Sequence, residues 1–114
     1  MDGCLFCKIV NGEIPSSKVY EDDLVYAFND IDPKAPVHIL IVPKTHAASI
    51  LEIDTQKKDY LTAMFAAANA IARDAGLADG GFRLVINTGK DGGQTVDHLH
   101  LHLMGGRQMG WPPG

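Results

Sequence analysis

The chain has 114 residues, enough for one domain over residues 1–114, and its 46% hydrophobic and 21% charged residues are ordinary for a globular protein. Its formal net charge of −4 without a basic stripe argues against polymeric nucleic acid as a partner, although a single nucleotide can still be held by backbone donors. We find neither a secretory signal nor an apolar run of membrane-spanning length, and therefore expect a cytoplasmic protein without a membrane partner.

The N-terminal segment contains both cysteines of the chain, Cys4 and Cys7. In a reducing compartment, a Cys-x-x-Cys pair is more typical of a metal clip or a redox pair than of a structural disulfide. Residues 4–12 are predicted to form a short helix that Gly12 closes, because glycine accepts the left-handed conformation after a last turn. Pro15 then starts an extended segment.

Three strands are predicted in the next part of the chain. Residues 18–21 and 24–29 form a hairpin around the tight turn at Asp22 and Asp23. Residues 32–36 contain two prolines, which remove backbone donors, so we expect a loop there. Residues 38–43 are the most strand-like segment, and their apolar residues on both faces predict a central strand.

The longest predicted helix runs from an N-cap at Asp54 or Thr55 to Ala75 and ends at Gly76. Apolar residues recur at helical spacing, which predicts one side packed on a sheet and no chemistry of its own. That side consists of Leu61, Met64, Phe65, Ala68, Ile71, Ala72 and Ala75.

The last part of the chain is predicted to contain a strand at 82–87, a polar glycine-rich loop at 89–97 and a strand at 99–104. The whole pattern has five strands and two helices. It indicates an α+β fold, in which a five-stranded, mainly antiparallel sheet carries the long helix and the short N-terminal helix.

Residues 96–104 read Val-Asp-His-Leu-His-Leu-His-Leu-Met. On a strand this alternation places His98, His100 and His102 on one face and three leucines on the other. Three charged imidazoles would repel one another, so we expect at least one to be neutral, as a metal ligand or as a nucleophile. Asp97, just before them, either orients a histidine or faces solvent.

This His-x-His-x-His pattern, followed by two apolar residues, resembles the signature of the histidine-triad nucleotide-binding family. Residues 30–36, 89–95 and 105–114 also resemble its Hint branch, so the resemblance covers nearly the whole chain. It implies a HIT-like fold and a homodimer. In such a dimer, the tail at 105–114 packs against the partner subunit near its active site, and Trp111 influences which leaving group fits.

The resemblance also implies roles for individual residues. His100 is the expected nucleophile, and His102 is expected to hydrogen-bond the α-phosphate oxygens. Asp30 is the expected acceptor for the ribose hydroxyls. Candidates for the wall around a purine are Phe6, Phe28 and Ile31, any of which could instead belong to the core. Backbone N–H groups of a glycine-rich loop can approach an anion closely, and the phosphate-binding candidates here are Asn87, Gly93, Gln94 and Thr95.

Cys4 and Cys7 could complete a tetrahedral Cys2His2 zinc site with His46 and His98. Many bacterial members of the resembled family hold such a structural zinc, and we expect one zinc ion per chain; the alternative leaves the thiols free. Four protein ligands leave no open position for a substrate water, so this zinc would be structural.

The predicted activity is hydrolysis of purine nucleoside phosphoramidates, with cleavage of the P–N bond at the α-phosphate through a covalent nucleotidyl-histidine and release of the nucleoside monophosphate. One alternative is a dinucleoside polyphosphate hydrolase of the Fhit type, against which the Hint-like C-terminal segment weighs. Another is a nucleotide-binding regulatory module in which hydrolysis is incidental. The residues indicate neither the natural amine nor a preference between adenine and guanine.

Overall fold

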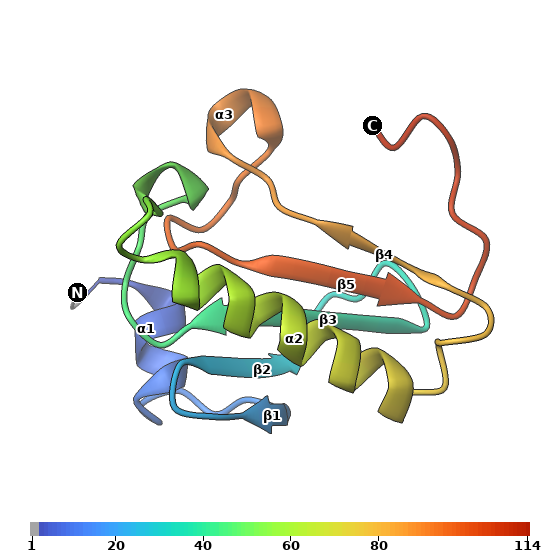
Figure 1. The fold of residues 1–114 in the computed structure, drawn as a ribbon, viewed down its shortest axis with the longest axis horizontal. Helices are drawn as coiled ribbons and strands as arrows, with labels where there is room; N and C mark the ends of the chain where they lie inside the picture. The colour runs from blue at the N-terminus through green and yellow to red at the C-terminus, as the bar shows by residue number, and fades with distance from the viewer. Residues whose placement is uncertain (1–2) are drawn as a thin grey trace.

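The fold is known from a computed structural model that describes residues 3–114. Five strands form one sheet in the order β1-β2-β3-β5-β4, and every neighbouring pair is antiparallel (Figure 1). The strands are β1 Lys18–Glu21, β2 Val25–Asn29, β3 Val37–Pro43, β4 Phe82–Val85 and β5 Leu101–Gly105. The helices are α1 Leu5–Val10, α2 Lys58–Asp74 and α3 Gly89–Gly92, with a 3-10 turn η1 at Ile50–Glu52. The predicted α+β fold with a five-stranded antiparallel sheet is confirmed.

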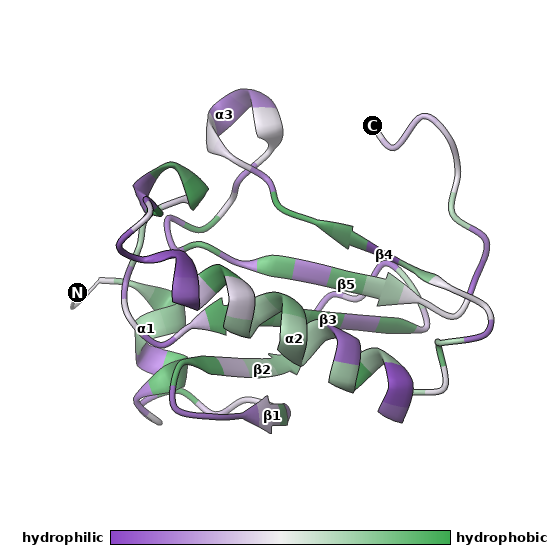
Figure 2. Ribbon diagram, in the orientation of Figure 1, coloured by the Kyte–Doolittle hydropathy of each residue, from purple (hydrophilic) through white to green (hydrophobic). Residues whose placement is uncertain are grey.

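The long helix α2 covers one face of the sheet and encloses the larger core. In Figure 2 the middle of α2 and the central strands are mainly hydrophobic, whereas both ends of α2 are hydrophilic. Alternate residues of the strands point into this core, because successive side chains of a strand point to opposite faces of the sheet. Its strand members are Val25, Ala27, Ile39, Ile41, Leu101 and Leu103. Among residues 3–114, none of the helices has the length and apolar character needed to span a bilayer.

The opposite face of the sheet carries a smaller apolar cluster under α1. Phe6 and Ile9 of the helix pack there on Phe28, Leu40 and other strand residues. Successive residues of β3 therefore point alternately into the larger core and into this smaller cluster, and β3 is buried on both faces. This agrees with its prediction as a central strand. The face under α1 is also the face on which the functional side chains gather.

The start of α2 differs from the prediction. The helix begins at Lys58, not after a cap at Asp54 or Thr55. A carboxylate oxygen of Asp54 accepts hydrogen bonds from the backbone N–H groups of Gln56 (2.9 Å) and Lys57 (3.2 Å). Asp54 therefore caps a separate turn that precedes the helix, which is why the expected N-cap was wrong.

The apolar side of α2 is also narrower than its spacing predicts. Met64, Ala68, Ile71 and Ala72 are buried as expected, but Phe65 is 41% exposed. Ala75 is exposed as well, and Ala67 is buried in its place on the sheet-facing side. Small alanines let the helix approach the sheet closely, whereas the bulky Phe65 lies at the margin of the contact.

Both C-terminal strands are shorter at one end than expected. The predicted strand at 82–87 ends at Val85, and α3 interrupts the predicted loop at 89–97. The last strand begins at Leu101 because the Leu99 N–H donates to the carbonyl of Ala47 (2.7 Å), a loop residue, and not to a neighbouring strand. His98 therefore lies in a bend and His100 in the irregular segment just before β5, and only His102 of the three lies within the sheet.

Candidate active site and metal-binding cluster

A cavity of about 680 Å³ opens on the α1 side of the sheet, a volume within the range of small-molecule sites. Its lining is mainly apolar, with polar groups concentrated where β2 and β5 reach it. Seven of the residues predicted to bind or cleave a nucleotide line this cavity. They are Phe6, Phe28, Asp30, Ile31, Thr95, His100 and His102.

His100 is almost completely buried, and one ring nitrogen has a partner that determines the position of its proton. Its Nδ1 lies 2.7 Å from the backbone carbonyl oxygen of His98. A carbonyl can only accept, so Nδ1–H is the donor, and the neutral ring carries an unprotonated Nε2. Phe6 packs edge-to-face on this ring with the centroids 5.1 Å apart, which limits its rotation. In its neutral form, His100 therefore presents an unprotonated and oriented Nε2 at the wall of the cavity.

His102 is oriented by a histidine from another strand. The backbone N–H of Lys34 donates to Nδ1 of His38 (3.0 Å), so the proton of the neutral His38 ring is on Nε2. This Nε2–H donates to Nδ1 of His102 (2.9 Å). The proton of His102 must then be on its Nε2, a buried atom without a hydrogen-bond partner in the described part of the chain. His102 is thus a ready hydrogen-bond donor at the cavity.

Both of these rings are held in the neutral form. Burial lowers the pKa of His102 to about 4, and the nearby rings of His100 and His38 act in the same direction. Burial also lowers the pKa of His38, against the Asp30 carboxylate, which raises it. An Asp30 carboxylate oxygen lies 3.4 Å from His38 Nε2, a distance that allows an electrostatic contact. His38 and His102 are accordingly a hydrogen-bonded pair with the Asp30 carboxylate beside them.

The glycine-rich loop before the histidines is built differently from the expectation. The Gln94 amide donates to the carbonyls of Ala48 (2.7 Å) and Val96 (2.9 Å) and accepts from the Gly89 N–H (3.0 Å). Its side chain is therefore already used to tie the loop together. Gln94, Asn87 and Gly93 are not among the residues that line the cavity, whereas Thr95 is.

Two further predicted site residues are exposed. Ile31 lines the cavity at its rim and is 100% exposed, and Trp111 of the tail is 84% exposed. Phe6 and Phe28, in contrast, are both buried and pack edge-to-face on each other (5.6 Å). These two aromatics therefore belong to the smaller core and to the cavity wall at once. Asp97 is exposed, as its solvent-facing alternative expects.

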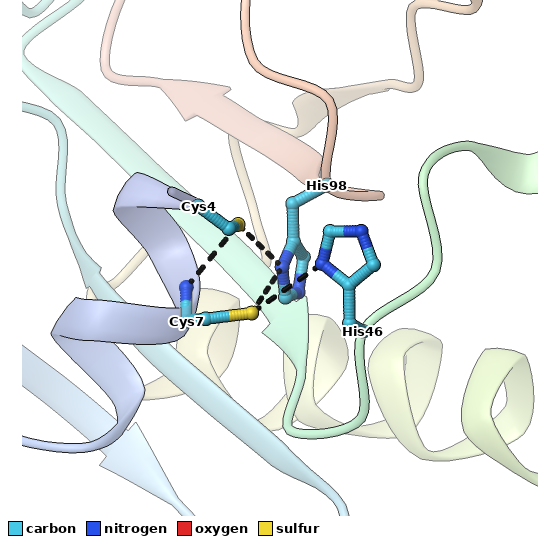
Figure 3. Close-up of side chains that lie close together, drawn as sticks. All are labelled: Cys4, Cys7, His46 and His98. Carbon is cyan, nitrogen blue, oxygen red and sulfur yellow. Dashed lines mark hydrogen bonds between the residues drawn. The ribbon is translucent and has the colours of Figure 1, made fainter. Parts of the chain in front are cut away.

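A second group of side chains lies beside the cavity, where α1 meets the segment before β5 (Figure 3). The sulfur of Cys4 lies 3.3 Å from Nδ1 of His98, and the sulfur of Cys7 lies 3.3 Å from Nδ1 of His46 and 3.5 Å from that of His98. All four donor atoms lie within 4.8 Å of one another. The structure therefore brings together the four residues that the sequence groups as a zinc site.

The geometry and the proton positions of this group fit zinc. Usual zinc bond lengths at a tetrahedral angle place a sulfur and a nitrogen ligand about 3.6 Å apart, close to the separations seen here. Nε2 of His98 lies 3.0 Å from the carbonyl oxygen of Pro43 and must donate to it, which leaves Nδ1 free to bind a metal. In the metal-free alternative, the same contacts are S–H···N hydrogen bonds.

His38 is a residue of this site that the sequence reasoning missed. It was assigned only to the start of a strand, because the apolar residues that follow it dominate that segment. The signal was present, since a histidine at the start of an otherwise apolar buried strand needs a polar partner. Its partner could not be identified without knowing that β3 pairs with β5, which places His38 and Leu40 opposite Met104 and His102.

The chain resembles known proteins over nearly its full length, and the HIT domain matches residues 11–109. A 14 kDa zinc-binding protein of Brassica juncea is 49% identical over 96% of this chain and 98% of its own. Adenylylsulfatase HINT1 of Arabidopsis thaliana is 48% identical, over 96% of this chain and 76% of its own. The purine nucleoside phosphoramidase of Escherichia coli is 46% identical, over 93% of this chain and 89% of its own.

The fold is matched equally well by solved structures. A HIT family hydrolase from Legionella pneumophila Philadelphia 1 superposes with a TM-score of 0.96 at 50% identity, covering 98% of this chain and 100% of that one. Sequence and fold agree along the same residues that carry the histidines and the cavity. This chain therefore belongs to the histidine-triad (HIT) domain family of nucleotide hydrolases, with relatives of the Hint type.

Proposed function

We propose that this protein hydrolyses purine nucleoside phosphoramidates at the α-phosphorus, with His100 as the nucleophile. The observation that carries the proposal is the hydrogen bond from His100 Nδ1 to the His98 carbonyl (2.7 Å), which leaves Nε2 unprotonated at a nucleotide-sized cavity. A neutral imidazole is a good nucleophile toward phosphorus. The 46% identity to a purine nucleoside phosphoramidase supports the choice of substrate class.

The cavity lining supports a specific placement of the nucleotide. Its apolar part, with Phe6, Phe28 and the rim residue Ile31, suits a purine ring, whose faces are apolar. Asp30 lies at the same cavity and can accept hydrogen bonds from ribose hydroxyls. His102 then receives the α-phosphate through its Nε2–H.

The phosphate would be held from the loop side as well. Thr95 lines the cavity and supplies a hydroxyl. Asn87, Gly93 and Gln94 remain candidates for the same phosphate through backbone N–H groups or small side-chain movements. Gln94 would act mainly by holding the loop, because its amide is engaged at three backbone groups.

The reaction is a double displacement at phosphorus. His100 Nε2 forms a bond to phosphorus while the P–N bond to the amine breaks, and the amine leaves with the electron pair and takes up a proton. A water molecule then attacks the same phosphorus and loses a proton, which balances the one taken up by the amine, while the bond to His100 breaks and the nucleoside monophosphate is released. The Nε2–H of His102 donates to the phosphoryl oxygens, whose negative charge develops in both transition states.

We propose a structural zinc ion bound by Cys4, Cys7, His46 and His98. The separations of the donor atoms and the free Nδ1 of His98 support it, and one relative is named as a zinc-binding protein. When bound, zinc supplies a cross-link between α1 and the segment before β5. His98 then anchors the chain whose carbonyl orients His100.

We also propose a homodimer that forms through the β4 edge of the sheet. The other edge, β1, carries a surface ion pair between Lys18 and Glu21 (3.2 Å), a feature that discourages pairing of edges. β4 instead presents Phe82, which is 37% exposed, and the exposed Trp111 follows in the tail. Light scattering should give twice the mass of one chain, and Phe82→Glu should lower it to that of a monomer.

A substrate panel tests the proposed activity. Initial rates should be compared for an adenosine phosphoramidate, a guanosine phosphoramidate, adenylyl sulfate and a diadenosine polyphosphate. We expect a phosphoramidate to have the highest kcat/KM, and acid-quenched enzyme to carry a nucleotide on His100. Faster cleavage of the diadenosine polyphosphate would favour the Fhit type of activity instead. Tight nucleotide binding with negligible turnover of every substrate would indicate a regulatory binding module.

A further inference from the structure

Lys34 is held by hydrogen bonds on both sides of its α-carbon. On one side, its N–H donates to His38 Nδ1 (3.0 Å). On the other, its carbonyl oxygen accepts from both Nε (3.2 Å) and Nη2 (3.0 Å) of Arg107. Arg107 lies just beyond the end of β5, in the C-terminal tail. One exposed arginine thus contacts the loop residue whose N–H orients the histidines.

The backbone of the tail permits this contact. Gly106 has φ +91°, a left-handed conformation that suits glycine. A Cβ at Gly106 would lie 2.9 Å from the Cβ of Pro36 in the same loop. Only a residue without a side chain therefore lets the tail lie against Pro36 and place the Arg107 guanidinium on Lys34. Guanidinium hydrogen bonds are charge-assisted and stronger than neutral ones.

The loop itself has few other restraints near Lys34. Its base is closed by the Asp30 N–H on the carbonyl of His38 (2.9 Å) and by the Asp32 N–H on the Asp30 carboxylate (2.9 Å). Asp32 and Lys34 pair with each other on the surface (2.6 Å) and do not reach the rest of the protein through that pair. Arg107 is therefore the contact that fixes the middle of the loop against the body of the protein.

The position of the Lys34 N–H matters because a neutral imidazole has two tautomers. With Lys34 donating to Nδ1 of His38, the protons of His38 and His102 are both on Nε2. If Lys34 moves away, His38 can hold its proton on Nδ1 and accept at Nε2. His102 would then donate from Nδ1 and present a bare Nε2 lone pair to an anionic phosphate, which repels it.

We propose that Arg107 is a positioning residue for His102: by holding the Lys34 carbonyl it keeps the Lys34 N–H on His38 and so keeps the His102 proton on the nitrogen that meets the phosphate. The proposal rests on the proposed function for its catalytic consequence. Its structural part concerns only proton positions in the protein without substrate.

The test compares Arg107→Met with Arg83→Met in the full-length protein. Arg83 is a matched control because it also holds the tail, through the Gly110 carbonyl (2.8 Å), but does not contact Lys34. Nitrogen-15 NMR of the histidine rings reports which nitrogen carries the proton. We expect Nε2–H at both His38 and His102 in the wild type and in Arg83→Met, and a second, Nδ1–H population at both rings in Arg107→Met.

Kinetics with an adenosine phosphoramidate that releases ammonia supply the second measurement, because so small a leaving group does not depend on the tail. We expect kcat to fall about tenfold in Arg107→Met with KM changed less than about twofold, and Arg107→Lys to recover part of the loss, since it keeps one donor. Removal of residues 108–114, which retains Arg107, should leave the tautomers unchanged. Removal of residues 107–114 takes Arg107 away as well and should produce the Nδ1–H population, so this pair of truncations tests the proposal if Arg107→Met folds poorly.

Two results would overturn the proposal. One is an unchanged tautomer at both rings in Arg107→Met. The other is an equal change in Arg83→Met, which would assign the effect to a loosened tail and not to Lys34. If the wild type hydrolyses no phosphoramidate, the proposed function fails while the NMR comparison still decides the role of Arg107.

Discussion

His98 and His100 lie two residues apart on the irregular segment before β5, yet they take part in two different groups of side chains. In the Cys/His cluster, His98 donates from Nε2 to the Pro43 carbonyl and directs its free Nδ1 at two sulfurs. In the cavity, His100 donates from Nδ1 to the His98 carbonyl and keeps Nε2 free. The residue type is the same. What would distinguish the proposed metal ligand from the proposed nucleophile is which ring nitrogen donates to a backbone carbonyl.

His102 provides a third arrangement. Its Nδ1 accepts from His38, so its proton remains on Nε2. His98 thus presents an unprotonated Nδ1, His100 an unprotonated Nε2, and His102 an Nε2–H. The comparison predicts that disruption of the cavity should abolish turnover without unfolding the protein, whereas disruption of the Cys/His cluster should mainly destabilise it.

The largest expected effect is that of His100→Ala on turnover. Loss of the nucleophile should lower kcat by at least about a thousandfold, because the covalent route is removed. AMP should still bind, since the residues proposed to contact the base, the ribose and most of the phosphate are others that line the cavity. Turnover is measured with a fluorogenic phosphoramidate and binding by calorimetry. A variant that retains more than about a tenth of wild-type kcat, a loss below roughly 1.4 kcal/mol, would remove His100 from this role.

The next largest effect should be a loss of thermal stability when the proposed zinc ligands are removed. Wild-type protein purified without chelator should contain close to one zinc ion per chain, and Cys4→Ser combined with Cys7→Ser should contain none. Free metal at about 100 times its Kd adds ~2.7 kcal/mol to the stability of a folded protein, so the double variant should melt about 10 °C lower. A chelator should lower the melting temperature of the wild type but not that of the double variant. Zinc-free wild type with unchanged melting would contradict the proposed site.

A smaller effect is expected on the pH dependence of the free energy of unfolding. The pKa of His102 is about 4 in the folded chain and ordinarily 6.5, so between these values the unfolded chain binds a proton that the folded chain does not. The free energy of unfolding should therefore fall as pH drops from about 6.5 toward 4. Urea denaturation at several pH values measures this slope, which should be shallower in His102→Asn. Identical slopes in the two proteins would show that His102 does not remain neutral on folding.

The smallest effect is expected from residues 108–114 of the tail, which do not line the cavity of the same chain. Removal of residues 108–114 takes away the exposed Trp111 and the Arg83 contact at Gly110. If the tail packs near a partner's cavity, the ratio of rates for bulky and small amine leaving groups should change a few-fold, with little change in melting temperature. Equal effects on all amines would exclude a role in specificity. A tryptophan emission maximum typical of full water exposure would show that Trp111 does not pack.

The sequence predicted the strands, the central position of β3 and the grouping of the four zinc-ligand candidates. These depend on alternation, spacing and residue type, which local sequence carries. It did not predict that Asp54 caps a separate turn. An aspartate that caps a turn and an aspartate that caps a helix occur in the same local sequence, so the sequence alone does not distinguish them. It named Gln94 as a candidate phosphate contact, and it did not predict that the Gln94 amide is engaged by backbone groups of its own loop and of Ala48.

The proton positions of the histidines were beyond sequence reasoning for a different reason. Each depends on a backbone group brought in by a distant segment, such as the Lys34 N–H at His38 or the Pro43 carbonyl at His98. Alternation could place three histidines on one face. It could not specify which of their six ring nitrogens would be free.

The sheet order β1-β2-β3-β5-β4 also bears on how the protein folds. β5 follows the other four strands in the chain but must insert between β3 and β4, and the His38–His102 contact joins residues 64 positions apart. Contacts between such distant residues form late and slowly. Until β5 inserts, β3 and β4 present open edges that can pair with other chains, and the imidazoles remain hydrated. During synthesis, the histidine arrangement of the cavity and the complete five-stranded sheet should therefore form in the same final step, so a chain stalled before β5 should be inactive and prone to aggregate.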